Sequence, residues 1–199
     1  MNALRLTDLL TPAEYLAREL ESPVKHEYVG GVVHAMSGAR VRHNRIVMSV
    51  LGRLSERLRG QACEPFGSDM KVRIQLPTHV RFYYPDAMVV CQSSAEGESF
   101  QDHPGLIVEV LSRGTRRADL GEKREGYLRI ASLASYLLVE QEAAEVVVYR
   151  RTDHGFIREV YQGLEAVIDL PEISCSLSLA EIYERVEFGP DPEEADDEA

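Results

Sequence analysis

The sequence predicts an α/β (α+β) domain in which a mixed β-sheet is flanked by helices. Segments whose apolar residues follow a helical period alternate with short apolar runs that turn residues bound on both sides. The chain has 199 residues, a length that suits one core of ordinary size. No internal repeat or low-complexity linker divides residues 1–189, so we expect them to form a single domain.

The first third of the chain contains two helix signals and one hairpin signal. Thr11, followed by Pro12 and Glu14, has the residue types of a capped helix start, which predicts a helix over 12–20. Gly30-Gly31 separates two strand-like runs and predicts a hairpin over 25–36. Residues 39–59 form a longer helix, whose apolar stripe comprises Ile46, Val47, Val50, Leu51, Leu54 and Leu58.

The remaining two thirds read as strands interrupted by one helix and closed by another. Helices are predicted where apolar positions return every three or four residues, over 120–130 and 179–186. Strands are predicted where apolar residues alternate or run without interruption, over 69–74, 85–90, 105–111, 135–140, 145–150 and 157–161.

The cysteines and the hydropathy pattern bear on the compartment. Cys63, Cys91 and Cys175 each lie in or beside an apolar run and form no C-x-x-C pair, so we expect buried, reduced thiols and a cytoplasmic location. No apolar stretch approaches the roughly 20 residues that span a bilayer. Acidic residues also interrupt the N-terminal segment where a signal peptide has its apolar core. We therefore expect no membrane partner.

The net charge of −11 argues at first against a nucleic-acid partner. Six of those negative charges lie in the last nine residues, and we expect 190–199 to be a disordered, solvated acidic tail. Positive charge is concentrated elsewhere, because residues 37–61 carry six arginines against one glutamate. The net charge therefore does not exclude a nucleic-acid partner for the domain.

Two carboxylates occupy unusual places in the predicted sheet. Glu109 interrupts the apolar run GLIVEVLS, and a carboxylate in a strand covered on both faces is costly unless it is paired or binds a metal. Asp86 opens the run PDAMVV. Glu109 could instead face solvent or pair with an arginine, and aspartate is common at strand starts. If the two strands are neighbours, both carboxylates converge where a hard cation such as Mg²⁺ could bind.

Several longer motifs resemble one known family. HEYVGGVVHAMSGA, RxxHNRI, YYPDAMVV, LIVEVLSRGTRRADLGEKREGYLRI and SYLLVEQ together resemble the Uma-two family of restriction-endonuclease-like proteins, within the PD-(D/E)XK nuclease superfamily. The resemblance runs from about Glu14 to Tyr183, and the block from Val108 to Tyr127 is its most specific part. It implies a mixed sheet flanked by helices, with a divalent-metal site, for Mg²⁺ or Mn²⁺, at the sheet edge.

The resemblance also implies roles for individual residues. Asp86 matches the Asp of the Pro-Asp motif, and Glu109 matches the acidic residue of the D/E-x-K motif, so these two are the expected metal ligands. Leu111 stands where the standard motif has its lysine. In the subfamily that this sequence resembles, a lysine of the following helix is thought to take over, and Lys123 matches it. Lys123 could also be a solvated residue that pairs with Asp119 one helical turn earlier.

Two further lysines are alternatives, since the chain has only three. Asp69-Met70-Lys71 is a literal D-x-K tripeptide, but it precedes the Pro-Asp motif, whereas the superfamily order places it afterwards. We expect Asp69 to lie near the site behind the metal ligands. Lys25 lies two residues before Glu27, on the same strand face.

Three more residues complete the predicted site. Glu27 matches an acidic residue before the family's glycine turn and is the expected third catalytic acid, with a surface hairpin position as the alternative. His43 opens the apolar stripe of the long helix, so it is either a core residue or a group that supports a metal ligand or a phosphate. Arg40 is an expected phosphate contact.

These expectations leave three functions open. The first is a Mg²⁺-dependent endonuclease that hydrolyses phosphodiester bonds of nucleic acid, with DNA as the expected substrate and a homodimer as the form that would cut both strands. The second is a nucleic-acid-binding or interaction protein on the same scaffold without catalysis, which Leu111 and the negative net charge favour. The third is a small-molecule hydrolase that uses the same metal site.

Overall fold

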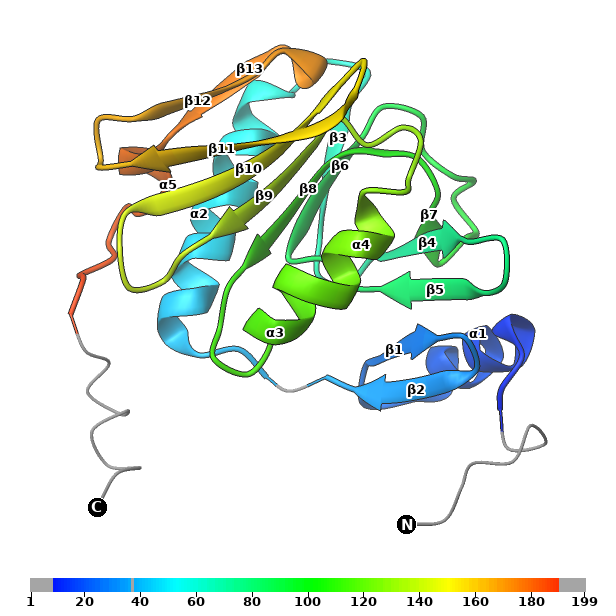
Figure 1. Cartoon of the computed structure of the whole chain (residues 1–199). Coiled ribbons are helices and arrows are strands. Elements are labelled where there is room, and N and C mark those ends of the chain that lie inside the picture. The colour runs from blue at the N-terminus through cyan, green and yellow to red at the C-terminus, as the bar shows by residue number, and fades with distance from the viewer. Residues whose placement is uncertain (1–8, 37, 190–199) are drawn as a thin grey trace, which may run out of the picture.

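A six-stranded mixed sheet forms the centre of the molecule in the computed structural model, which describes residues 9–36 and 38–189 (Figure 1). Its strand order is β11-β10-β9-β8-β6-β3, and β8 and β9 are parallel while the other neighbours are antiparallel. Its strands are β3 (Glu64–Gly67), β6 (Ala87–Val90), β8 (Pro104–Val110), β9 (Ser135–Val139), β10 (Glu145–Thr152) and β11 (Gly155–Gln162).

A second sheet and a separate strand pair complete the β structure. The second sheet has the order β2-β1-β5-β4-β7, and β12 pairs with β13. The hairpin turn between β1 and β2 uses left-handed backbone at Gly30 and Gly31, which is the reason for two glycines there. These strands are β1 (His26–Val29), β2 (Val32–Ala35), β4 (Lys71–Gln75), β5 (Val80–Tyr83), β7 (Phe100–Gln101), β12 (Val167–Leu170) and β13 (Cys175–Ser178).

The helices begin where the sequence provides caps. Thr11 and Glu14 form a capping box at α1, and Ser178 and Glu181 form another at α5. A π-helical turn, Asp119–Lys123, joins α3 to α4, and a 3₁₀ turn, Pro171–Ile173, precedes β13. The α-helices are α1 (Pro12–Glu21), α2 (Val41–Arg57), α3 (Arg116–Ala118), α4 (Arg124–Tyr127) and α5 (Leu179–Ile182).

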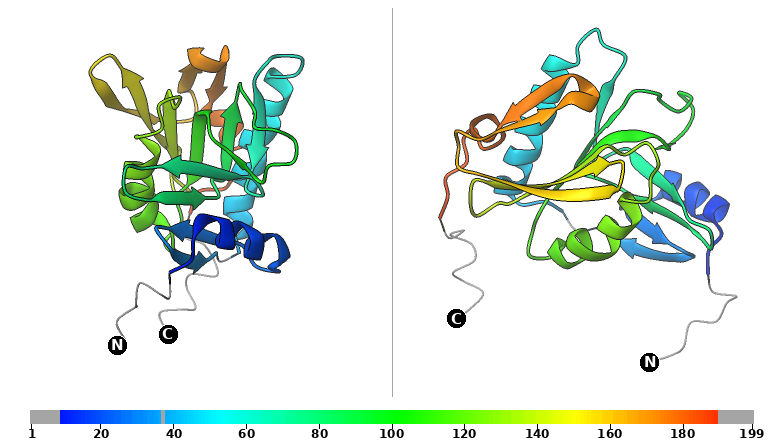
Figure 2. Two further views of the ribbon diagram at one scale, coloured as in Figure 1. Left: turned by 90° about the vertical axis from the view of Figure 1, so that its right-hand side faces the viewer. Right: turned by 45° about the horizontal axis from the view of Figure 1, so that its top comes forward.

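The two faces of the central sheet pack against different layers. Helix α2 packs on one face together with α5 and the β12–β13 pair, burying Ile46 and Leu54 against Val89 and Val108. Helix α4 and the second sheet cover the other face, where Tyr127 packs near Ile107. Figure 2 shows the β1–β2 hairpin and α1 at the end of the molecule where β4 and β5 separate them from the central sheet. The edge of the central sheet where β6 begins and β8 ends therefore lies between the helices on one face and the second sheet on the other.

The predicted fold class, a mixed sheet flanked by helices, is confirmed. The long apolar runs of β6, β8 and β9 and the long helix α2 all form where the sequence predicts them, within two residues at each end. The sequence reading missed β3, β5, β7, β12 and β13, which are at most four residues long and, unlike β6, have no continuous apolar run to mark them.

Two predicted helices differ from the structure. The helix expected over 120–130 begins at Arg116 and contains the π-helical turn, and its α-helical part ends at Tyr127. The closing helix, expected over 179–186, ends at Ile182. Arg185 adopts a left-handed backbone conformation with φ 64°, which an α-helix does not accommodate.

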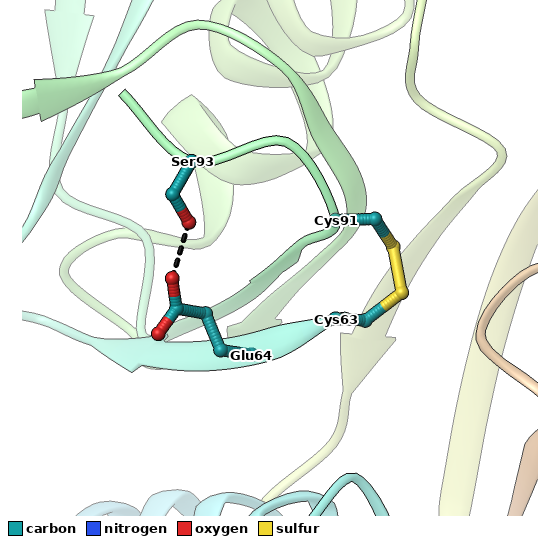
Figure 3. Close-up of a disulfide and its surroundings, with 4 residues drawn as sticks. All are labelled: Cys63, Glu64, Cys91 and Ser93. Atoms are coloured by element: carbon teal, nitrogen blue, oxygen red, sulfur yellow. Dashed lines mark hydrogen bonds between the residues drawn. A yellow bond between two sulfur atoms is a disulfide. The ribbon is translucent and has the colours of Figure 1, made fainter. Parts of the chain in front are cut away.

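The expectation of reduced, buried cysteines is wrong for two of the three. Cys63 and Cys91 form a disulfide (Figure 3). Cys91 is exposed. Glu64 pairs with Val90 in the antiparallel β3–β6 ladder, so Cys63 and Cys91 are the next facing positions outward. Because the sequence did not predict β3, it did not predict that these two cysteines would face each other. The cysteines therefore no longer support the expectation of a cytoplasmic location.

No helix among the described residues is long and apolar enough to cross a membrane. The acidic tail expected over 190–199 lies outside the described residues.

We predict that the purified, unreduced protein contains one reactive thiol, that of Cys175, once it is unfolded. Reduction should raise the count to three. Reduction, or replacement of Cys63 and Cys91 by serine, should lower the free energy of unfolding by roughly 2–4 kcal/mol, because the bridge closes a loop with a sequence separation of 28. Thiol titration in denaturant and urea unfolding measure these quantities. Three reactive thiols before reduction would contradict the disulfide.

Candidate functional site

Asp86 and Glu109 lie on neighbouring strands at the same edge of the central sheet. Ala87 faces Val108 in the β6–β8 ladder, so the same register places Asp86 opposite Glu109. Facing residues of an antiparallel pair project from the same face. The backbone N–H of Val110 donates to Asp86 Oδ2 over 2.7 Å, which holds the Asp86 carboxylate against β8. The structure thus brings together the two carboxylates that the sequence singles out.

The Glu109 carboxylate is buried, with 3 % of the residue exposed. Lys123 Nζ lies 3.3 Å from its Oε1, and the Tyr127 hydroxyl donates to the same oxygen over 2.8 Å. Burial raises the pKa of Glu109 well above its usual range, although the Lys123 ammonium opposes that shift. Burial and the nearby Glu109 charge also raise the pKa of Tyr127, so its hydroxyl remains a donor. Glu109 is therefore neither solvent-facing nor paired with an arginine.

Lys123 is the centre of a buried ionic cluster. Its Nζ lies 2.8 Å from Glu27 Oε1 and 3.4 Å from Asp119 Oδ1, in addition to the Glu109 contact. Burial alone would lower the pKa of Lys123, but the three carboxylates outweigh burial and raise it. The solvated position considered as the alternative for Lys123 is excluded, since only 5 % of the residue is exposed.

His43, in the first turn of α2, contacts the Asp86 carboxylate. His43 Nε2 lies 3.2 Å from Asp86 Oδ2, whereas Nδ1 is buried without a hydrogen-bond partner. Burial lowers the pKa of His43, but the hydrogen bond and the charge of Asp86 outweigh it and raise the pKa overall. His43 therefore holds Asp86 from the α2 side, while Val110 holds it from the β8 side.

The literal D-x-K tripeptide points elsewhere. The Asp69 side chain is 94 % exposed and forms an ion pair with Lys25. It therefore does not lie behind Asp86 and Glu109, where the sequence predicted it. Lys71 is buried and donates to the Tyr84 hydroxyl over 3.2 Å. Burial lowers the pKa of Lys71. Lys25 and Tyr84 line the cavity described next, whereas Asp69 and Lys71 do not.

A cavity of about 1140 Å³ opens onto this cluster. Asp86, Glu109, Asp119 and Lys123 form part of its lining, and so does Leu111. The lining also includes charged residues from three other segments, which are Arg40 and Arg42 at the start of α2, Arg113 and Arg116 after β8, and Glu140, Glu142 and Glu145 around the β9–β10 turn.

Sequence reasoning missed two residues of the cluster. Asp119 was considered only as a helix-surface partner of Lys123, yet 1 % of it is exposed. Tyr127 was read as a core apolar position, but its hydroxyl bonds to Glu109. The four-residue spacing from Asp119 to Lys123 was a usable signal, because two such residues share a helix face and must share its environment.

The donor set fits a hard divalent cation that keeps part of its own hydration. Asp86 and Glu109 provide carboxylate oxygens at the wall of a cavity. Among the described residues, no group of three or more His, Cys, Asp or Glu side chains could hold a metal ion by itself. Mg²⁺ favours coordination by two carboxylates, with waters and phosphate oxygens as its remaining ligands.

Comparisons with known proteins agree with the sequence resemblance. A family model described as "Uma2: Putative restriction endonuclease" matches residues 12–181. The uncharacterised protein slr1290 of Synechocystis sp. strain PCC 6803 is 33 % identical over 181 residues, which cover 90 % of this chain and 94 % of that protein. Protein sll1609 of the same organism, also uncharacterised, is 32 % identical over 173 residues, which cover 85 % of this chain and 97 % of that protein.

A solved structure shares the fold. It is the crystal structure of a protein from Anabaena variabilis ATCC 29413 described as a "putative nuclease belonging to DUF820". The match has a TM-score of 0.69 and 18 % sequence identity, and it covers 89 % of this chain and 99 % of that one. At this identity the likeness establishes the fold alone.

We predict strong energetic coupling between Lys123 and Glu109. Lys123→Met should lower the free energy of unfolding at pH 7 by roughly 3–5 kcal/mol, because it leaves buried carboxylates without a counter-charge. Adding Glu109→Gln should recover at least about 1 kcal/mol of that loss. Urea unfolding of the four proteins of this double-mutant cycle measures the coupling.

The rim pair Arg116–Glu140 provides a matched control, since its arginine side chain is half exposed. The same cycle there should give a coupling below about 1 kcal/mol. Equal coupling energies for the two pairs would mean that the Lys123 cluster is solvated in solution.

Proposed function

Since the chain belongs to the Uma2 family, we propose that it is a divalent-metal-dependent endonuclease that hydrolyses phosphodiester bonds of DNA. One observation carries the proposal: two carboxylates on adjacent strands and a buried lysine meet at the floor of a cavity large enough for a nucleotide segment. Hydrolysis of a phosphodiester needs a site for a divalent cation, a cation near the attacking water, and positive groups for the flanking phosphates.

Asp86 and Glu109 are the residues that would hold Mg²⁺ or Mn²⁺. The bound ion would neutralise charge on the scissile phosphate and lower the pKa of a bound water. The chain's own contribution is to orient the two carboxylates. Asp86 is held by the Val110 N–H and by His43, and Glu109 is held by the Tyr127 hydroxyl, so both carboxylates are fixed before substrate binds.

Lys123 would provide the cation that the standard motif places two residues after the acidic residue. Its Nζ reaches Glu109 Oε1 at 3.3 Å from the π-helical turn, while Leu111 occupies the standard position with an apolar side chain. Stabilisation of the charge that develops on the phosphate depends on the position of the ammonium and not on the backbone segment that carries the lysine. Glu27, at 2.8 Å from Lys123, would hold that ammonium in place.

The cavity lining indicates how the DNA backbone would be held. Arg40 and Arg42 lie at the cavity wall beside His43, so phosphates next to the scissile one would contact the start of α2. The Arg116–Glu140 ion pair forms part of the same lining. A two-fold dimer would allow both strands of a duplex to be cut, and we include it in the proposal.

The proposed activity predicts Mg²⁺- or Mn²⁺-dependent nicking of supercoiled plasmid by the full chain. Asp86→Ala and Glu109→Ala should each abolish nicking, and calorimetric titration with Mn²⁺ should show weaker binding by Glu109→Ala than by the wild type. Lys71→Ala is the matched control, because Lys71 is a buried lysine that does not line the cavity. Equal Mn²⁺ binding by wild type and Glu109→Ala would exclude the metal site. DNA binding without nicking would favour a non-catalytic binding protein on this scaffold.

A relocated lysine should rescue a Lys123 variant. We expect Lys123→Ala to lose nicking, and Leu111→Lys combined with Lys123→Ala to recover part of it, because positions 109 and 111 project from the same strand face. The double variant also restores a positive charge beside the buried carboxylates and should unfold at higher urea concentration than Lys123→Ala. Plasmid nicking and urea unfolding of both variants measure this. Unchanged nicking by Lys123→Ala would show that the lysine is not needed.

A further inference from the structure

Asp119 is a buried charge that the proposed activity does not yet use. Only 1 % of the residue is exposed, and it lines the same cavity as Asp86 and Glu109. Its Oδ1 is one of three buried side-chain atoms in the described part of the chain that have no hydrogen-bond partner. An acceptor left in this state costs stability, so its retention calls for an explanation.

The ion pair with Lys123 does not by itself account for this buried carboxylate. Lys123 already contacts Glu27 at 2.8 Å and Glu109 at 3.3 Å, so a third carboxylate exceeds what one ammonium can balance. The backbone N–H of Asp119 donates to the Thr115 carbonyl over 2.9 Å, and its carbonyl accepts from the Tyr136 hydroxyl over 3.1 Å. These contacts anchor the backbone and do not involve the side chain.

The π-helical turn places Asp119 and Lys123 on the same wall of the cavity. The turn begins at Asp119 and ends at Lys123, and Oδ1 and Nζ lie 3.4 Å apart. A water molecule can approach both atoms at hydrogen-bond distance when they are this close, accepting from the ammonium and donating to Oδ1. Single π-helical turns within helices frequently mark functional sites.

We propose that Asp119 is a further catalytic residue, whose Oδ1 accepts a hydrogen bond from the attacking water and thereby aims it at the phosphorus. The inference rests on the proposed endonuclease function and assigns Asp119 a hydrogen bond, not a proton transfer. With Lys123 donating to the same water, two contacts set its orientation before the phosphate arrives. Oδ1, which has no hydrogen-bond partner within the protein, is then the acceptor for this water.

Asparagine and alanine distinguish this role from that of a counter-charge for Lys123. Asp119→Asn keeps an oxygen acceptor of the same shape, and the Lys123 ammonium attracts the amide oxygen and repels the amide NH₂, so the oxygen faces the lysine. Asp119→Ala removes the acceptor. A water site needs the oxygen, whereas a counter-charge needs the negative charge that both variants lack.

The experiment compares plasmid nicking by the full chain and both variants at saturating Mn²⁺. We expect Asp119→Ala to lose kcat by about 100-fold or more with little change in KM, and Asp119→Asn to stay within about tenfold of the wild type. Calorimetric Mn²⁺ binding should be unchanged in both variants. Glu172→Ala is the matched control, because Glu172 also has a buried carboxylate oxygen without a hydrogen-bond partner but does not line the cavity, and it should nick at the wild-type rate.

Equal losses in Asp119→Asn and Asp119→Ala would overturn the water site in favour of a counter-charge, and wild-type nicking by Asp119→Ala would overturn any catalytic role. If circular dichroism shows that Asp119→Ala is unfolded, Asp119→Leu, which has a similar shape and no acceptor, replaces it in the comparison. A wild-type protein that nicks no DNA with either Mg²⁺ or Mn²⁺ would instead refute the proposed function, so the two failures are separate results.

Discussion

The site depends on a single buried ammonium. Lys123 contacts Glu27, Glu109 and Asp119, and these groups come from β1, β8 and the π-helical turn before α4. A carboxylate buried as deeply as Glu109 is strongly destabilising without a counter-charge, so Lys123 stabilises the central position of β8 in the sheet. The hairpin, the central sheet and the helical segment are thus held in one arrangement by charge as well as by packing.

Aromatic packing supports this ionic cluster from the second sheet and from α4. The Tyr127 ring contacts the Tyr83 and Tyr136 rings edge-on, with centroid distances of 5.6 and 5.3 Å. The same tyrosine donates its hydroxyl to Glu109. The apolar ring lies in the core while the hydroxyl faces the charge, which is how a tyrosine can belong to both environments. Rigid support of this kind holds the carboxylates at the cavity wall.

The sequence predicted the parts of the site that lie on strong periodic elements. Asp86 and Glu109 were found because each departs from an apolar run, and His43 because α2 has a clear apolar stripe. Asp69 was misplaced because the strand expected over 69–74 begins only at Lys71, so Asp69 lies in the turn between β3 and β4. Asp119 and Tyr127 were missed because burial of a helix face is decided by what packs against it. The Cys63–Cys91 bridge was missed with the short strand β3.

The sequence by itself determined the fold class, the long helix α2, the buried central strands and the unusual carboxylates, because hydrophobic periodicity is a local property that each segment carries. The tertiary structure alone decided which charges meet. Glu27 and Lys123 are far apart in the chain, and only the packing of the hairpin and the π-helical turn against the sheet edge places their atoms at 2.8 Å. Contacts between distant segments depend on strand register and layer packing, which local patterns do not specify.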